Sequence, residues 1–194
     1  MIKSIFGLIP ARGGSKRLPG KNLKLLAGVS LLARAIAHAK VLPVTVVSTD
    51  DPETMALANR LGVHALLRPA YLASDNATTE DVIEHAANVY PMFEWFCLLQ
   101  PTSPLRTAGD IRACIDLALS TERPVVSVCN GRRNGAVYVG RTLALPNEYW
   151  LDAITYEMPP GRSIDIDTLA DFNEAERVLN ASEIRTSSTG QVLS

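Results

Sequence analysis

The sequence has few cysteines, few aromatic residues and almost no excess of charge. Its cysteines, Cys97, Cys114 and Cys129, are odd in number and show no C-x-x-C spacing, which favours buried reduced thiols over a disulfide framework or a zinc site. The net charge of -1 lacks the basic excess typical of nucleic-acid or anionic-membrane binding. No apolar run approaches the ~18 residues of a membrane helix. The sequence therefore predicts a soluble, cytoplasmic protein with neither nucleic-acid nor membrane partners.

Apolar segments and segments of helical periodicity alternate along most of the chain. The expected strands are 5–9, 44–47, 63–67, 93–99, 124–128, 135–139 and 153–158. The expected helices are 30–41, 52–61, 78–90, 107–119 and 168–179. This alternation predicts an α/β domain of three layers around a mostly parallel, doubly wound sheet, in which the unbroken apolar run 93–99 is a central strand. One domain is expected over 1–181, followed by a disordered polar tail over 182–194.

A basic, glycine-rich loop follows the first expected strand, within residues 8–22. Gly13 and Gly14 would let the backbone approach a ligand closely. Its four cations are Arg12, Lys16, Arg17 and Lys21. Ligands of open α/β sheets bind at this carboxyl edge, yet the loop matches neither the Walker A pattern nor the G-x-G-x-x-G fingerprint. The loop predicts a polyphosphate site, and the alternative is a solvated surface loop.

A pair of carboxylates, Asp165 and Asp167, precedes the last expected helix. Residues two apart in an extended segment share a face, so both carboxylates could hold one oxygen-preferring cation while Ile164 and Ile166 face the core. The alternative is a strand end whose carboxylates are solvated ahead of a helix cap.

Four stretches together resemble the N-acylneuraminate cytidylyltransferase family, in order and in spacing. They are 9–22, 67–79, 98–106, and 134–138 followed by 163–168. The resemblance implies a Rossmann-like fold of the nucleotide-diphospho-sugar transferase type. It also implies that the anomeric hydroxyl of a 2-keto sugar acid attacks the α-phosphorus of CTP, with pyrophosphate leaving and Mg²⁺ as the cofactor. Such sugars belong to lipopolysaccharide or capsule biosynthesis.

The resemblance also implies roles for individual residues. Arg12, Lys16 and Lys21 would stabilise the leaving pyrophosphate, while Asp165 and Asp167 would hold Mg²⁺. The implied nucleotide-binding residues are Ala11, Arg12, Gly13, Ser15, Lys16, Lys21, Asn22, Arg68, Ala77 and Thr79. Those implied to face the acceptor sugar are Gln100, Arg132, Asn134 and Tyr138. Thr78 and Thr79 could instead serve only as helix caps, and Arg17 stands where many members have glycine.

The chain departs from the family between the fifth expected strand and Asn134. Familiar members carry a few dozen more residues there, in a segment that reaches a partner subunit and helps complete the acceptor pocket. The shorter connection weakens the expectation of a homodimer and widens the acceptors to legionaminic, pseudaminic or ketodeoxyoctonic acid. Arg132 or Arg133 could hold the acceptor carboxylate, or both could lie in a solvent-facing turn. Two other functions stay open: a sugar 1-phosphate nucleotidyltransferase, and an inactive nucleotide-binding homologue.

Overall fold

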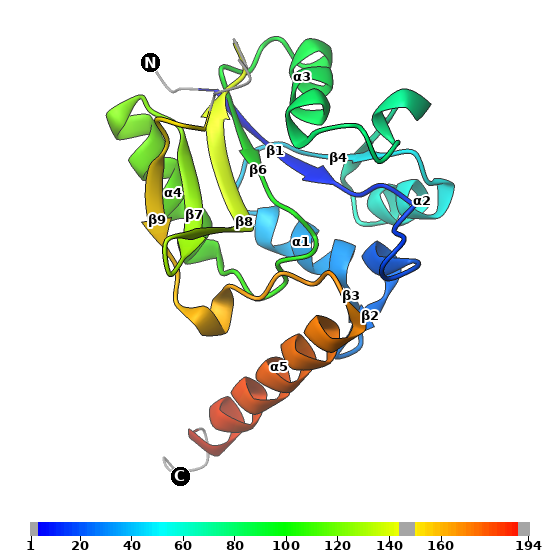
Figure 1. Ribbon diagram of the computed structural model, residues 1–194, viewed down its shortest axis with the longest axis vertical. Coiled ribbons are helices and arrows are strands. Elements are labelled where there is room, and N and C mark those ends of the chain that lie inside the picture. The colour runs from blue at the N-terminus through cyan, green and yellow to red at the C-terminus, as the bar shows by residue number, and fades with distance from the viewer. Residues whose placement is uncertain (1–3, 144–149, 190–194) are drawn as a thin grey trace.

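A seven-stranded sheet forms the centre of the computed structural model, which describes residues 4–143 and 150–189 (Figure 1). Its strands are β1 Ile5–Pro10, β4 Thr45–Thr49, β5 His64–Leu67, β6 Trp95–Leu98, β7 Val125–Cys129, β8 Arg132–Arg141 and β9 Ile154–Glu157. They lie in the order β5-β4-β1-β6-β8-β7-β9, so β6 is central as predicted. Neighbours are parallel except at β8, which is antiparallel to both β6 and β7. The prediction of a mostly parallel sheet is confirmed.

Helices cover both faces of the sheet. They are α1 Leu31–Ala39, α2 Pro52–Arg60, α3 Thr79–Val89, α4 Ala108–Thr121 and α5 Leu169–Thr189. One core cluster joins α1, α2 and α4 to the sheet, and a second joins α3 to its other face. In β1, Ile5 and Ile9 belong to the first cluster, whereas Phe6 and Leu8 belong to the second. Burial on both faces explains the unbroken apolar strands, and the three predicted layers are confirmed.

Side-chain caps fix where the helices begin. Thr78 and Asp81 form a capping box at the start of α3, as do Thr107 and Asp110 at the start of α4. Thr168 and Asp171 exchange the same pair of hydrogen bonds before α5. Each box satisfies backbone N–H groups that the first turn leaves unpaired, so these three predicted helix starts are confirmed.

The position of β8 was not predicted from the sequence. Asn130 and Gly131 have φ of 51° and 71°, the left-handed conformation that a tight two-residue hairpin needs, and they join β7 directly to β8. The returning strand fills the place between β6 and β7. A second small hairpin, β2 Leu25–Leu26 with β3 Val29–Ser30, was also not anticipated.

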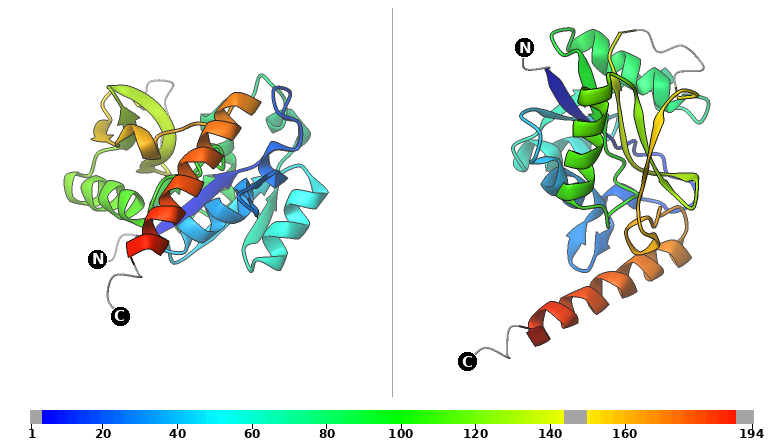
Figure 2. Two further views of the ribbon diagram at one scale, coloured as in Figure 1. Left: turned by 90° about the horizontal axis from the view of Figure 1, so that it is seen from below. Right: turned by 90° about the vertical axis from the view of Figure 1, so that its left-hand side faces the viewer.

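The last helix is longer than predicted. It continues to Thr189, past the expected end at 179, so the expectation of disorder is wrong for 182–189, while 190–194 lie outside the described residues. The sequence holds no proline or glycine between Gly161 and Gly190, so nothing in it breaks the helix. Its first turns pack Phe172 and Ala175 into a third core cluster, and its far end extends away from the sheet (Figures 1 and 2).

Two sequence-based exclusions concern thiols and membranes. Cys97 and Cys114 are buried and Cys129 is half-buried, and all three are free, as predicted. Burial raises the pKa of the Cys97 thiol to about 12. Within the described ranges, no helix is long and apolar enough to cross a membrane.

Candidate active site

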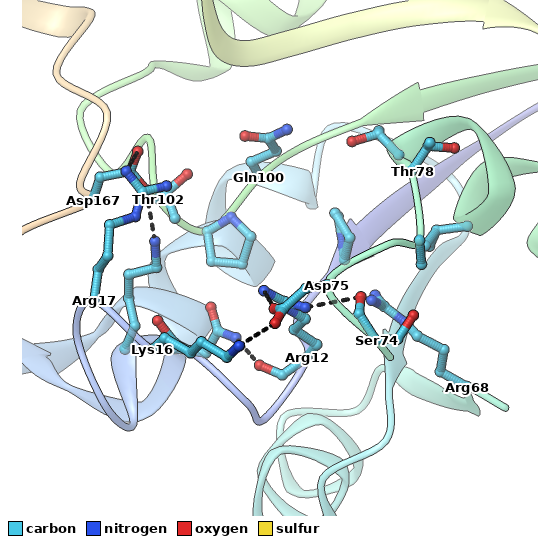
Figure 3. A pocket seen from close by; sticks show the side chains of 18 of the residues that line it. Arg12, Lys16, Arg17, Arg68, Ser74, Asp75, Thr78, Gln100, Thr102 and Asp167 are labelled. Atoms are coloured by element: carbon cyan, nitrogen blue, oxygen red, sulfur yellow. Dashed lines mark hydrogen bonds and ion pairs between the residues drawn. The ribbon is translucent and has the colours of Figure 1, made fainter. Parts of the chain in front are cut away.

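A cavity of about 630 Å³ opens at the carboxyl ends of β1, β5 and β6 (Figure 3). Eleven of the predicted site residues line it: Arg12, Ser15, Lys16, Lys21, Asn22, Arg68, Ala77, Thr79, Gln100, Asp165 and Asp167. The basic loop and the Asp165 and Asp167 pair, more than 140 residues apart in sequence, therefore meet at one edge of the sheet, where ligands of open α/β folds bind.

Lys21 joins the basic loop to the carboxylate pair. It begins the 3₁₀ turn Lys21–Leu23 behind Gly20, which has a φ of 65°. Its Nζ donates to the Ile166 carbonyl oxygen at 2.9 Å and contacts Asp167 Oδ1 at 3.2 Å. Arg17 Nη1 lies 3.0 Å from Asp167 Oδ2. Each oxygen of the Asp167 carboxylate thus has a cation from the loop.

Arg12 and Lys16 share a second carboxylate, that of Asp75. Arg12 donates to the Ser74 carbonyl oxygen and to Asp75 Oδ1, both at 3.0 Å, and Lys16 Nζ pairs with Asp75 Oδ2 (Figure 3). Hydrogen bonds from Lys16 and Arg12 lower the pKa of Asp75, which keeps it ionised. All four cations of the loop are therefore paired, two by Asp75 and two by Asp167.

The segment that carries the carboxylate pair alternates as predicted. Ile166 is fully buried, and its N–H donates to the Thr102 carbonyl oxygen at 2.8 Å, while Asp165 and Asp167 line the cavity. Asp165 is exposed to the cavity, but the recess around it removes part of its hydration. This desolvation raises the pKa of Asp165, and the neighbouring negative charge of Asp167 raises it further. A hydrogen bond with Thr102 lowers this pKa in part.

The carboxylate pair has the chemistry of a divalent-cation site. Across the ranges that the structure describes, no cluster of three or more His, Cys, Asp or Glu side chains is arranged to hold a metal. Asp165 and Asp167, which both line the cavity, could supply two oxygen ligands to an ion that takes its other ligands from phosphates and water. Lys21 and Arg17 contact the same Asp167 carboxylate.

Arg68 is held in the cavity wall by β4. Its side chain is buried, with Nε donating to Ser48 Oγ at 3.1 Å and Nη2 to the Ser48 carbonyl oxygen at 2.9 Å. Burial lowers the pKa of Arg68 to about 10, so it stays charged at neutral pH. It lines the cavity together with Ala77 and Thr79.

Two predicted nucleotide-binding residues lie outside this cavity, and their places explain why. Ala11 is fully buried beneath the loop and donates its N–H to the Ser48 carbonyl oxygen. Gly13 faces α2 instead: its N–H donates to Asp50 Oδ1, and a Cβ there would lie 2.9 Å from Asp51 Cβ. Gly13 is therefore needed for packing against Asp51, whereas close approach of a ligand was predicted.

Three predicted acceptor residues also lie outside the cavity, because the short hairpin carries them along β8. Arg132 is exposed beside the turn, and Tyr138 packs against Trp150 at 5.3 Å between ring centroids. Asn134 is buried: its Oδ1 accepts from Ser127 Oγ at 2.6 Å, and its Nδ2 donates to Ser163 Oγ at 3.0 Å. Arg132 is exposed and the amide of Asn134 is bonded within the protein, so neither is placed to contact an acceptor in the cavity. Tyr138 lies near enough to Asp165 for that charge to act on it, and its acceptor contact stays a prediction.

Gln100 is the predicted acceptor residue that does reach the cavity. It follows β6, and its side chain lies against the backbone of Gly135, where a Cβ would stand 2.7 Å from Gln100 Oε1. Sequence reasoning missed Asp75 and Thr102 as cavity residues. Both lie in stretches that carried the family resemblance, but no residue pattern marks a single loop aspartate as the partner of two cations.

We expect Asp75→Asn to bind inorganic tripolyphosphate about two- to fivefold more tightly than the wild type. The substitution removes the carboxylate that competes for Arg12 and Lys16, and the gain is modest because solvent-exposed ion pairs of this kind are weak. Isothermal titration calorimetry measures the change. Asp116→Asn, on the exposed face of α4, controls for the altered net charge. Weaker binding by Asp75→Asn would mean that Asp75 holds Arg12 in its binding position.

Comparison with known proteins connects this cavity to a family. The cytidylyltransferase family model matches residues 6–136. N-acylneuraminate cytidylyltransferase of Escherichia coli is 38% identical over 138 residues, which are 69% of this chain and 33% of that protein. CMP-N,N'-diacetyllegionaminic acid synthase of Legionella pneumophila is 39% identical over 132 residues, or 64% of this chain and 57% of that protein. The chain thus spans one third to just over half of these relatives.

Solved structures share the fold over nearly the whole chain. The CTP complex of CMP:2-keto-3-deoxy-manno-octonic acid synthetase superposes with a TM-score of 0.76 at 16% identity, covering 93% of this chain and 100% of that one. A Mycobacterium tuberculosis protein solved with manganese gives a TM-score of 0.64 at 15% identity, covering 90% and 99%. These likenesses confirm the predicted fold. With the family model matched over more than half of its length, this chain belongs to the cytidylyltransferase family.

Proposed function

We propose that the protein transfers CMP from CTP to the anomeric hydroxyl of a 2-keto sugar acid and releases pyrophosphate. The observation that carries the proposal is the meeting of the basic loop with Asp165 and Asp167 in one cavity of a cytidylyltransferase fold. Relatives named for N-acylneuraminate, legionaminic acid and pseudaminic acid support a 2-keto sugar acid as the acceptor class.

The nucleotide half of the proposal uses two walls of the cavity. Arg68, Ala77 and Thr79 would contact the base and ribose beside the start of α3, where N–H groups of a helix terminus favour acceptors. Asn22 supports the loop from within, because its Nδ2 donates to the Arg12 carbonyl oxygen at 2.9 Å. Ser15 lines the same side of the cavity.

The leaving group would be stabilised by the cations of the loop. Arg12 and Lys16 would exchange Asp75 for phosphate oxygens, while Lys21 stays beside Asp167 and close to the reacting phosphate. Positioning and electrostatic stabilisation carry most of the catalysis in phosphoryl and nucleotidyl transfer. Cations already fixed by hydrogen bonds need little rearrangement when charge develops on the pyrophosphate.

Asp165 and Asp167 would hold Mg²⁺. When bound, that ion neutralises charge on the phosphates and orients the α-phosphorus for attack. The chemistry of the donor pair supports this assignment, and a structural relative was solved with manganese. The protein's own contribution would be to place both carboxylates on one face of the segment, with Lys21 beside Asp167 to limit their mutual repulsion.

On the acceptor side, Gln100 remains the residue proposed to contact the sugar acid, since its amide stands in the cavity next to Thr102. Arg132 and Asn134 are not proposed again, and the acceptor contact of Tyr138 stays a prediction. A homodimer, a cytoplasmic location and a part in lipopolysaccharide or capsule synthesis stay predictions.

A pyrophosphate-release screen tests the function by pairing each nucleoside triphosphate with a panel of 2-keto sugar acids and sugar 1-phosphates. We expect release only with CTP and a 2-keto sugar acid, and normal release by Arg132→Ala, because Arg132 lies outside the cavity. Preference for a sugar 1-phosphate would replace the proposal with the related transferase. CTP binding without pyrophosphate release from any pair would identify an inactive homologue.

A further inference from the structure

The carboxylate pair lies on a segment without regular secondary structure, and its position therefore depends on specific contacts. Residues 163–167 connect the 3₁₀ turn Pro160–Arg162 to α5. Near Asp165 and Asp167 the segment is fixed by the hydrogen bond from Ile166 N–H to Thr102 and by the burial of Ile166. At the other end it is fixed through Arg162.

Arg162 makes a two-pronged ion pair with Asp110 at the start of α4. Its Nη2 lies 2.8 Å from Asp110 Oδ1, and its Nε lies 3.1 Å from Asp110 Oδ2. This parallel geometry is the strongest form of an arginine–carboxylate contact, because it fixes direction as well as distance. The α4 terminus follows the loop that carries Gln100 and Thr102, so the ion pair fixes the turn before the Asp165 segment to the element that follows this loop.

The Asp110 carboxylate makes more contacts than the capping of α4 requires. Its carboxylate also accepts from Thr107 N–H at 2.8 Å, from Thr107 Oγ at 2.7 Å and from Tyr156 Oη at 3.2 Å, and only 1% of Asp110 is exposed. Burial alone would raise the pKa of Asp110, but the bonds from Arg162 and Thr107 lower it. A buried carboxylate is costly unless it is paired, and capping alone requires no burial.

Asp81 provides the comparison within the same molecule. It completes the capping box of α3 in the same way, with its Oδ2 accepting from Thr78 N–H at 2.7 Å, but it is only half-buried and no arginine among the described contacts pairs with it. Asp110 differs from Asp81 in its burial and in its bonds with Tyr156 and with Arg162, which ends the turn before the Asp165 segment.

We propose that Arg162, through its ion pair with Asp110, is a positioning residue that sets the Asp165 and Asp167 carboxylates in the cavity. The proposal rests on the proposed function for its catalytic meaning, but the placement of the segment can be measured without any reaction. The second anchor of the turn is the bond from Asn134 Nδ2 to Ser163 Oγ, which gives the buried Asn134 a part in the same placement.

Amide hydrogen exchange of the full-length protein tests the placement directly. In Arg162→Met, which keeps most of the apolar stem but removes the guanidinium, we expect exchange over 163–168 to rise about tenfold or more, with exchange over β6 unchanged. Arg162→Lys, which keeps the positive charge but not the planar pair of donors, should recover part of the protection. Asp110→Asn should behave like Arg162→Met, whereas Asp81→Asn, the matched loss of a capping carboxylate, should leave 163–168 unchanged. Unchanged exchange over 163–168 in Arg162→Met, or an equal rise over β6, would overturn the proposal.

Metal binding and turnover give the second readout. The Mn²⁺ dissociation constant, measured by the electron paramagnetic resonance of free Mn²⁺ with CTP present and no acceptor, should rise about fivefold or more in Arg162→Met. Turnover should fall about tenfold with the KM for CTP nearly constant, since small misplacements of catalytic groups lower rates strongly. Faster exchange with unchanged Mn²⁺ affinity would overturn the positioning role. If the wild type bound no Mn²⁺ in the presence of CTP, the metal assignment would be wrong. The hydrogen-exchange result alone would then decide whether Arg162 positions the segment.

Discussion

Asp167→Asn is expected to reduce turnover by about 10²-fold or more, the scale of lost electrostatic stabilisation at a charged transition state. The substitution keeps the size of the side chain but removes the charge that faces the cavity between Lys21 and Arg17. The affinity for CTP should change much less, because both cations then become available to the phosphates. Steady-state kinetics at several Mg²⁺ concentrations, with CTP affinity from calorimetry, measure the two effects separately.

The control for Asp167→Asn is Asp116→Asn, which removes one negative charge from the exposed face of α4. Its turnover should match that of the wild type. If Asp167→Asn reached wild-type turnover at saturating Mg²⁺, Asp167 would not be a metal ligand. The cations of the loop would then have to stabilise the charge on the pyrophosphate without a metal ion held by Asp167.

Lys21→Ala is expected to weaken triphosphate binding and turnover together, lowering kcat/KM by about 10²-fold or more. Only 14% of the Lys21 side chain is exposed, and its Nζ is fixed between the Ile166 carbonyl oxygen and Asp167. The truncation removes the donor to the Ile166 carbonyl oxygen and leaves Asp167 paired with Arg17 alone, so ground-state binding and transition-state stabilisation should both weaken. Calorimetry with CTP and steady-state kinetics check the two parts.

Lys24→Ala is the matched control for this variant. Lys24 follows Lys21 by one helical turn of the chain, yet its Nζ lies over the Phe172 ring at 5.3 Å and it does not line the cavity. We expect its kcat/KM to stay within about twofold of the wild type, as for a surface substitution. A similar loss in both lysine variants would point to the stability of the loop rather than to the position of the Lys21 charge.

The sequence was sufficient for features that depend on local physics. The capping box of Thr78 and Asp81 fixes the start of α3 wherever the helix packs, and the alternation from Ile164 to Asp167 holds because Ile166 needs burial. The basic loop was predicted for the same reason, since cations and glycines directly after a strand are typical of an anion-binding site at the carboxyl edge of a sheet. These predictions need no knowledge of what lies across the cavity.

Features that depend on distant partners were not predictable. The pairing of Arg12 and Lys16 with Asp75 joins residues about sixty positions apart, and no local pattern specifies it. Asn134 resembled a ligand-binding residue, but its amide is used by Ser127 and Ser163 once the Asn130 and Gly131 turn has placed β8. The position of Gly13 outside the cavity likewise depends on a distant residue, because Gly13 packs against Asp51.

The paired cations also affect how an anion reaches the cavity. Because Asp75 and Asp167 offset only two of the four positive charges of the loop, the field that reaches a Debye length into solution is weaker than four unpaired cations would give, and long-range steering of anions should be reduced accordingly. An ion with one or two charges gains little by replacing a carboxylate that is tethered in place. A chain of phosphates could replace Asp75 and contact Lys21 at the same time, so we expect the cavity to favour longer phosphate chains before any base is recognised.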